Sequence, residues 1–249
     1  IDVWIDRPLV DGPRPLVIFA HGLAGHPRTF EMLRSHLAAE GFVVVSPAFP
    51  LTNNDVPGAN QNWGDVSEQV TDISFLIDSV RADPEIGPLI DDGPVGMIGH
   101  SLGGVTAAGA ALSVDSRDER IGVAVLLSSA IAFEQLRLGG DLSAQIPVMV
   151  LVGDEDQSIP HELAVAAYAA LAAERVFVTL YGGDHTTGIK DDNTDHGKAV
   201  RAAAAAFLAR SVGVEDGQLA ALEAAPRSDV VIQAGGPAGE LDDWRDYFS

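Results

Sequence analysis

Cysteine is absent from the 249-residue chain. Disulfide bonds, thiolate metal sites and a cysteine nucleophile are therefore excluded. No apolar run approaches the roughly 18 residues of a membrane-spanning helix, and the chain begins at Ile1 without a charged-then-apolar leader. We expect no membrane span, and the sequence is compatible with both a secreted and a cytoplasmic protein.

Basic residues are scarce, and lysine occurs only at positions 190 and 198. The chain carries 15 Lys and Arg against 36 Asp and Glu, a formal net charge of −21. Such a surplus of negative charge repels phosphate backbones and anionic membrane surfaces. We therefore expect neither nucleic acid nor an anionic membrane surface as a partner. Nothing in the sequence indicates an oligomeric state.

Continuous apolar runs alternate with helical segments along most of the chain. This alternation predicts an α/β fold with a doubly wound, mostly parallel sheet covered by helices on both faces. The predicted strands are residues 3–5, 16–20, 42–46, 94–98, 123–127, 148–152 and 176–180, and the predicted helices are 30–40, 66–81, 103–112 and 198–210.

The length fits one large domain, and no low-complexity break divides it. We predict a single domain over residues 1–249, with a core of about 1–212 and a C-terminal extension of about 213–249. The aromatic residues of this extension favour a segment that wraps the surface of the domain. A tail that binds a partner is the alternative.

A Gly-His-Ser-Leu-Gly-Gly segment, residues 99–104, lies between a predicted buried strand and a predicted helix of small residues. A G-x-S-x-G motif in this context forms a sharp turn that exposes the serine oxygen at the carboxyl edge of a sheet. The turn strains the backbone of Ser101 and leaves no room for side chains at Gly99 and Gly103. A glycine-rich turn without chemistry is the alternative, which the strand before and the helix after argue against.

A serine hydroxyl needs a base, and the base needs an orienting carboxylate, before the oxygen becomes a useful nucleophile. The loop after the strand at 148–152 carries Asp154 and Asp156, and the loop after the strand at 176–180 carries His185. His196, just before the last helix, is the alternative base. The order serine, aspartate, histidine is the order of α/β-hydrolases.

On these motifs the chain resembles the α/β-hydrolase superfamily over about residues 1 to 212. It looks most like the lid-less esterases of the dienelactone-hydrolase-like, cutinase-like and platelet-activating-factor-acetylhydrolase-like group. The resemblance rests on four segments in order: His21-Gly22, residues 99–104, the Gly-x-x-Asp-x-x-x-Pro stretch at 153–160, and Gly183-x-His185.

The resemblance implies that Ser101 is the nucleophile and His185 the general base. It selects Asp156, four residues before a proline, as the orienting acid, with Asp154 as the competitor. The backbone amide of Leu102, just after the nucleophile, is one expected oxyanion donor. The resemblance places the second donor at the amide of Leu23, and implies that His21 joins loops by hydrogen bonds to the backbone.

The expected substrates follow from the nucleophile and from the loop lengths. Serine at position 101 excludes the chemistry of an aspartate nucleophile and leaves esters, thioesters or amides. Only residues 128–147 separate two predicted strands, too few for a large lid, so we expect an open groove. The candidate groove residues on predicted loops at the same edge are Phe49, Trp63, Ala130, Ile131, Phe133 and Ile159, for each of which a place in the core is the alternative. His100, in the turn before Ser101, either lines the groove or points its ring away from the nucleophile.

We predict a serine carboxylic-ester hydrolase acting on short-chain or polyester-like esters, with a small-molecule or polymeric ester as its partner. A thioesterase or a peptidase of the same fold is the alternative, followed by a non-catalytic binding protein. Strongly polyester-active relatives carry aromatic residues where this chain has His100 and Ala130, a departure from that subgroup. We expect no cofactor and no metal, because the acidic loop 191–195 fits too few positions of a calcium loop.

Overall fold

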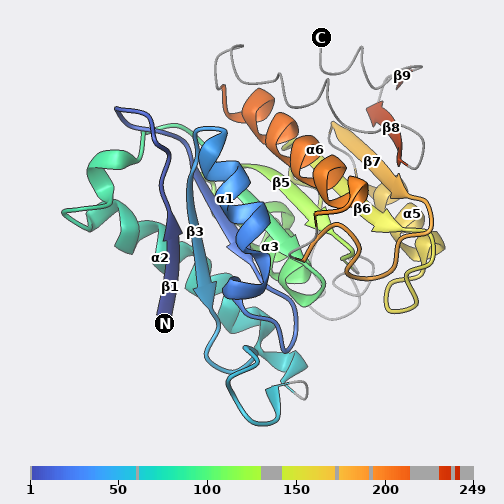
Figure 1. The fold of residues 1–249 in the computed structure, drawn as a ribbon, viewed down its shortest axis with the longest axis horizontal. Coiled ribbons are helices and arrows are strands. Elements are labelled where there is room, and N and C mark those ends of the chain that lie inside the picture. Colours follow the sequence, from blue (N-terminus) through green and yellow to red (C-terminus); the bar gives the residue numbers. More distant parts are fainter. Residues whose placement is uncertain are drawn as a thin grey trace.

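A central sheet of nine strands organises the part of the chain that the computed structural model describes, which is residues 2–59, 62–129, 142–171, 174–190, 193–213, 230–236 and 239–241. The strands are β1 (Asp2–Asp6), β2 (Leu16–Ala20), β3 (Val43–Ala48), β4 (Val95–His100), β5 (Ile121–Leu127), β6 (Val148–Gly153), β7 (Arg175–Leu180), β8 (Val230–Gly236) and β9 (Gly239–Leu241). Their order across the sheet is β1-β3-β2-β4-β5-β6-β7-β8-β9 (Figure 1).

Six neighbouring strands are parallel to one another: β3, β2, β4, β5, β6 and β7. At the edges, β1 pairs antiparallel with β3, β8 with β7, and β9 with β8. The predicted doubly wound, mostly parallel α/β fold is confirmed. Because parallel strands end at one edge of the sheet, the loops after β4, β6 and β7 meet there. These are the loops that carry the predicted chemistry.

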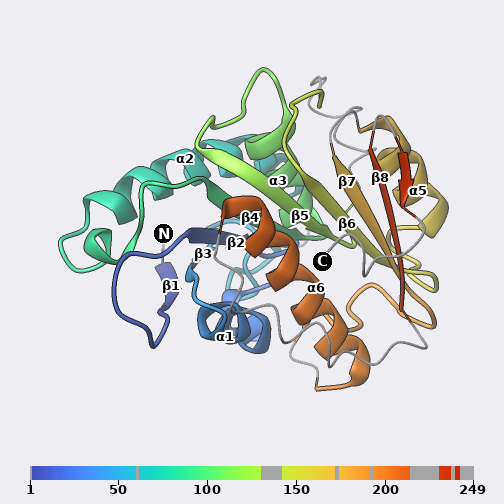
Figure 2. The same ribbon diagram turned by 90° about the horizontal axis from the view of Figure 1, so that it is seen from above.

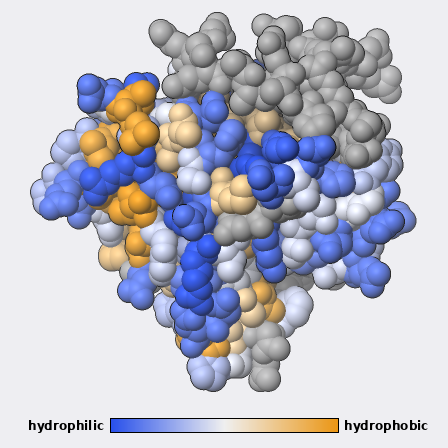
Figure 3. All heavy atoms as spheres, in the orientation of Figure 1, coloured by the Kyte–Doolittle hydropathy of each residue, from blue (hydrophilic) through white to orange (hydrophobic). Residues whose placement is uncertain are grey.

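Helices cover both faces of the sheet, as Figure 2 shows. On one face lie α1 (Glu31–Ala39) and α6 (Asp195–Val212), and on the other lie α2 (Val66–Ala82), α3 (Leu102–Leu112) and α5 (His161–Ala170). Short 3-10 turns complete the described helical segments: η1 (Pro27–Phe30), η3 (Trp63–Asp65) and η4 (Gly87–Leu89). No helix in the described ranges is both long enough and apolar enough to cross a membrane. The molecular face in Figure 3 is mostly hydrophilic, with apolar areas interspersed.

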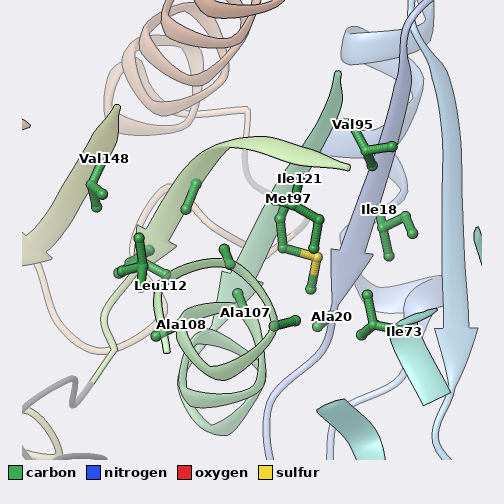
Figure 4. Close-up of a cluster of buried hydrophobic side chains, with 14 of the residues drawn as sticks. Ile18, Ala20, Ile73, Val95, Met97, Ala107, Ala108, Leu112, Ile121 and Val148 are labelled. Atoms are coloured by element: carbon green, nitrogen blue, oxygen red, sulfur yellow. The ribbon is translucent and has the colours of Figure 1, made fainter. Parts of the chain in front are cut away.

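Two apolar layers, one on each side of the sheet, form the core. Alternate residues of one strand face opposite layers, so Ile18 belongs to the layer under α2 and α3 while Phe19 belongs to the layer under α1 and α6. Both faces of the parallel strands are buried, which explains why their sequences are continuously apolar. In Figure 4, Ala107 of α3 lies on the side of Met97 of β4 and Ala108 lies nearer Leu112, and the small alanine side chains let this helix lie close to the sheet.

Part of the predicted C-terminal extension belongs to the sheet. Residues 230–236 form β8, which pairs antiparallel with β7 from Leu180↔Val230 to Arg175↔Gly235, and β9 pairs with β8. The expectation of a segment that only wraps the surface is therefore corrected for these residues. Pairing with a distant strand is a long-range event that the local sequence pattern does not encode.

Candidate active site

Ser101 lies in the sharp turn between β4 and α3, with φ 55° and ψ −120°. Its amide donates to the carbonyl oxygen of Leu127 at the end of β5, at 3.0 Å. A Cβ on Gly99 would lie 2.1 Å from the carbonyl oxygen of Gly103, and a Cβ on Gly103 would lie 2.2 Å from that of Ala20. Both glycines of the motif are therefore steric requirements of this turn, as the sequence predicts.

The structure brings Ser101, His185 and Asp156 together at the carboxyl edge of the sheet. Nε2 of His185 lies 2.9 Å from Oγ of Ser101, and Nδ1 of His185 lies 2.9 Å from Oδ2 of Asp156. The Asp156 side chain is fully buried, whereas the His185 side chain is 22% exposed. One continuous series of hydrogen bonds thus runs from a buried carboxylate to a serine hydroxyl.

The surroundings of Asp156 keep its carboxylate ionised. Burial raises the pKa of this carboxyl, but hydrogen bonds from His185 and from the amides of Ile159 and Ser158 outweigh burial and leave the pKa below its usual value. The two amides donate to Oδ1 at 2.8 Å each, so Oδ2 is left for the imidazole. Since an ionised carboxylate only accepts, Nδ1 of His185 carries the hydrogen and Nε2 presents its lone pair to Ser101.

The two carboxylates of the loop after β6 have different partners. Asp154 is exposed and accepts a hydrogen bond from the amide of Gly182, at 2.6 Å, which joins the loops after β6 and β7. Asp156 is the carboxylate that meets His185, and His185, rather than the alternative His196 in α6, completes the series. Asp184 shapes the loop just before His185 by accepting hydrogen bonds from the residues that follow.

On the other side of Ser101, the loop after β2 packs directly against the turn. A Cβ on Gly22 would lie 2.9 Å from Cβ of Ser101. His21 donates from Nδ1 to the carbonyl oxygen of Gly22 at 2.8 Å and accepts at Nε2 from the amide of Phe49 at 3.1 Å. Burial lowers the pKa of His21 to about 4, so the ring stays neutral and keeps both bonds. His21 therefore ties the loop that carries Leu23 to the segment after β3.

Leu23 and Leu102 lie together in a small apolar cluster apart from the two core layers. Leu23 packs against Leu102 and Val105 of α3 and against Val66 at the start of α2. Leu102 is also the first residue of α3, where backbone amides lack acceptors within the helix. This arrangement gives the site an apolar wall beside a helix N-terminus.

The candidate groove residues have different environments. Trp63 is 52% exposed, whereas Ile159 is buried and its amide binds Asp156. Phe49 is completely buried, and its ring centroid lies 5.2 Å from that of His21. Of the two places predicted for Phe49, the groove is corrected and the core is found, because this ring belongs to the core layer below the loop. Ala130, Ile131 and Phe133 lie outside the described residues.

His100 is also not a groove residue. It is 4% exposed, and its ring lies between those of Phe30 and His185, with centroids at 5.6 and 5.0 Å. Nε2 of His100 lies 3.0 Å from the carbonyl oxygen of His185. Of the two placements that the sequence leaves open for His100, the one along the groove is corrected, since the sharp turn that exposes Ser101 directs the preceding side chain inward.

A buried polar network beneath the site is not predicted by the sequence motifs. Gln69 of α2 donates to Thr52 at 2.8 Å and to Asp65 at 3.0 Å, and accepts from Thr106 of α3 at 2.7 Å. The sequence carries a signal for it: Gln69 occurs among the apolar residues that mark the buried face of the predicted helix 66–81. The network fixes α3, and with it the turn at Ser101, to α2 and to the loop after β3.

No cluster of three or more potential metal ligands occurs among the residues that the structure describes. Asp191 and Asp192, the start of the acidic loop considered from the sequence, lie outside those residues.

Comparisons with known proteins identify the family of the chain. No curated protein sequence matches the chain significantly. The fold is similar to the solved structure of Est1E from Butyrivibrio proteoclasticus, with a TM-score of 0.64 over 85% of this chain and 94% of that chain, at 18% sequence identity. The model of the alpha/beta hydrolase family matches residues 17–247. The chain therefore belongs to the alpha/beta hydrolase family.

Proposed function

We propose that this hydrolase is a serine carboxylic-ester hydrolase that works through Ser101, His185 and Asp156. The observation that carries the proposal is the series of hydrogen bonds from Asp156 through His185 to Ser101, with both bonds at 2.9 Å. The strained turn adds support, because it presents the serine oxygen at the edge where the three loops meet.

In the proposed first step, Oγ of Ser101 attacks the ester carbonyl carbon while Nε2 of His185 takes the hydroxyl proton. The carbonyl oxygen becomes an oxyanion, which the amides of Leu23 and Leu102 stabilise. Each such donor contributes about 3 to 4 kcal/mol to the transition state. The imidazolium then protonates the leaving alcohol, and an acyl group remains on Ser101.

In the second step, His185 removes a proton from water, and the resulting hydroxide attacks the acyl carbon. Return of this proton to Oγ of Ser101 releases the carboxylic acid and restores the enzyme. Asp156 stays ionised throughout and stabilises the imidazolium. The steps use groups of the chain and water, so the proposed reaction needs neither a metal nor a cofactor.

We propose short-chain esters as the preferred substrates, with polyester-like esters as the second class. The apolar wall of Leu23 and Leu102 suits a small acyl group, and the exposed Trp63 offers an aromatic surface at the end of the loop after β3. We also propose that residues 1–249 form a single domain, since strands from near both ends of the chain belong to one sheet.

The test is hydrolysis of p-nitrophenyl esters from acetate to palmitate by the wild type, by Ser101→Ala and by Ser35→Ala. Ser35 is an exposed serine of α1, distant in sequence from the site, and serves as the matched control. We expect turnover to fall roughly 10⁴-fold or more in Ser101→Ala, with an unchanged circular dichroism spectrum, and to stay at the wild-type level in Ser35→Ala. Turnover that survives in folded Ser101→Ala contradicts the proposal. Parallel assays on a thioester and an amide distinguish a thioesterase and a peptidase.

A further inference from the structure

His100 precedes Ser101, yet it makes its polar contact with the loop that carries His185. Nε2 of His100 lies 3.0 Å from the carbonyl oxygen of His185. A carbonyl oxygen only accepts, so Nε2 of His100 carries the hydrogen and donates it. The backbone of His185 is thus bonded directly to the residue beside Ser101, although the two lie 85 positions apart in the chain.

Nδ1, the second nitrogen of the His100 ring, is buried and has no hydrogen-bond partner among the residues that the structure describes. A Cβ on Gly22 would lie 3.2 Å from this atom, so the ring packs closely against the loop after β2. A hydrogen on Nδ1 would have no acceptor, and burial lowers the pKa of His100 to about 3. The ring is therefore neutral, with a single possible donor.

The His100 ring also packs against two other aromatic rings. The His100 ring centroid lies 5.0 Å from that of His185 at an interplanar angle of 43°, and Phe30 packs against His100 from η1 at 5.6 Å. Asp156 accepts a hydrogen bond from Nδ1 of the His185 imidazole. The orientation of His185 is thus constrained through its ring by Asp156 and through its backbone by His100.

We propose that His100 is a positioning residue: its Nε2–H, acting through the carbonyl group of His185, holds the His185 imidazole in line between Ser101 and Asp156. This inference rests on the proposed function, because it concerns the geometry of the proposed base. His100 touches no reacting atom, so its loss affects the chemical step through misplacement of His185. Misplacement of a reacting group by about 1 Å costs up to roughly 100-fold in rate.

The test compares His100→Gln, His100→Asn and His100→Leu with the wild type. The terminal amide nitrogen of glutamine reaches the place of Nε2, whereas that of asparagine reaches only the place of Nδ1. We expect kcat to fall about 10- to 100-fold in His100→Asn and His100→Leu, with KM near the wild-type value, and to recover to within a few-fold in His100→Gln. The rate at which a fluorophosphonate labels Ser101 should follow the same order. His36→Leu, a change of a half-buried histidine in α1, is the control and should behave as the wild type.

Equal activity in the glutamine, asparagine and leucine variants overturns the inference, whether all three are active or all three are impaired. A second measurement does not depend on folding of the variants. Nitrogen NMR of the wild type should show His100 as the neutral Nε2–H form, and an Nδ1–H form would overturn the inference. A wild type that neither hydrolyses esters nor reacts with the fluorophosphonate contradicts the proposed function instead, and the NMR result then still decides whether His100 makes its bond.

Discussion

Two serines that follow the neighbouring strands β4 and β5 have positive φ angles, which side chains rarely allow. Ser101 after β4 has φ 55°, and Ser128 after β5 has φ 45°. Such a conformation costs about 1–3 kcal/mol per residue and persists only where the surrounding structure holds it. Here each amide bonds to the end of the neighbouring strand, Ser101 to Leu127 at 3.0 Å and Ser128 to Leu151 at 2.7 Å. The sheet edge therefore holds the turn that exposes the proposed nucleophile.

At the same scale, the two carboxylates after β6 give a matched pair of variants. Asp156→Asn replaces the carboxylate that receives the Nδ1 hydrogen of His185, so we expect kcat to fall roughly 10⁴-fold. Asp154→Asn changes an exposed carboxylate bonded to Gly182, and we expect no more than a few-fold effect. Steady-state hydrolysis of p-nitrophenyl acetate measures both. A fully active Asp156→Asn enzyme would mean that another group orients His185.

The sequence predicts the positions of reactive residues better than it predicts burial. Ser101, His185 and Asp156 follow three predicted strands, and parallel strands bring such positions to one edge whatever their separation in the chain. Phe49 follows β3 and His100 ends β4 at the same edge of the sheet, but both side chains turn inward. That direction depends on packing against Phe30 and His21, which a reading along the chain does not contain.

At the scale of elements, the parallel strands were predicted well because both of their faces are buried. The run at 16–20 coincides with β2. Each of the other predicted strands between 42 and 180 differs from the observed strand by one to three residues, counted over both of its ends. The sequence does not predict the membership of β8 in the sheet, because antiparallel pairing with β7 joins residues 50 to 60 positions apart, from Leu180↔Val230 to Arg175↔Gly235. The start of the helix predicted at 30–40 also differs: Phe30 ends η1, which His26 caps, and α1 begins at Glu31.

One ion-pair network joins α2 to the turn before β5 and makes the stability of the protein depend on pH. Asp118 accepts hydrogen bonds from Arg120 at 2.6 and 2.9 Å, and Arg120 also bonds to Asp78 of α2. The hydrogen bonds from the Arg120 side chain lower the pKa of Asp118 to about 2, against 3.8 for a free carboxyl. The unfolded chain therefore takes up this proton at a higher pH than the folded chain does.

We expect Asp118 to stabilise the fold fully above about pH 4 and to lose this contribution as the pH falls towards 2, a difference of about 1–2 kcal/mol. Asp118→Asn should be less stable than the wild type at neutral pH and less sensitive to acid in that window. Urea unfolding at a series of pH values measures both effects, with the exposed Asp115→Asn as the control. Parallel acid profiles for the wild type and Asp118→Asn would contradict this assignment.

At the scale of the whole molecule, the net charge of −21 acts on stability. Like charges on one surface repel each other, and dissolved ions screen the repulsion. We expect the Tm to rise by roughly 2 to 8 °C between low and moderate NaCl concentrations, which corresponds to about 1–2 kcal/mol for a chain of this size. Thermal unfolding followed by circular dichroism measures the change, and an uncharged cosolute at equal osmolality is the control. A Tm that is insensitive to salt would show that the charges are too far apart to interact.

The pairing of β8 with β7 has a consequence for protein engineering. A shortened chain ending at Gly213 keeps Ser101, Asp156 and His185 but lacks β8. The outer backbone groups of β7, the strand that leads to the His185 loop, would then be unpaired along its whole length. An uncovered edge strand of this kind pairs with strands of other chains. We therefore expect the truncated chain to aggregate. The residues beyond 213 therefore belong in any minimal version of this enzyme.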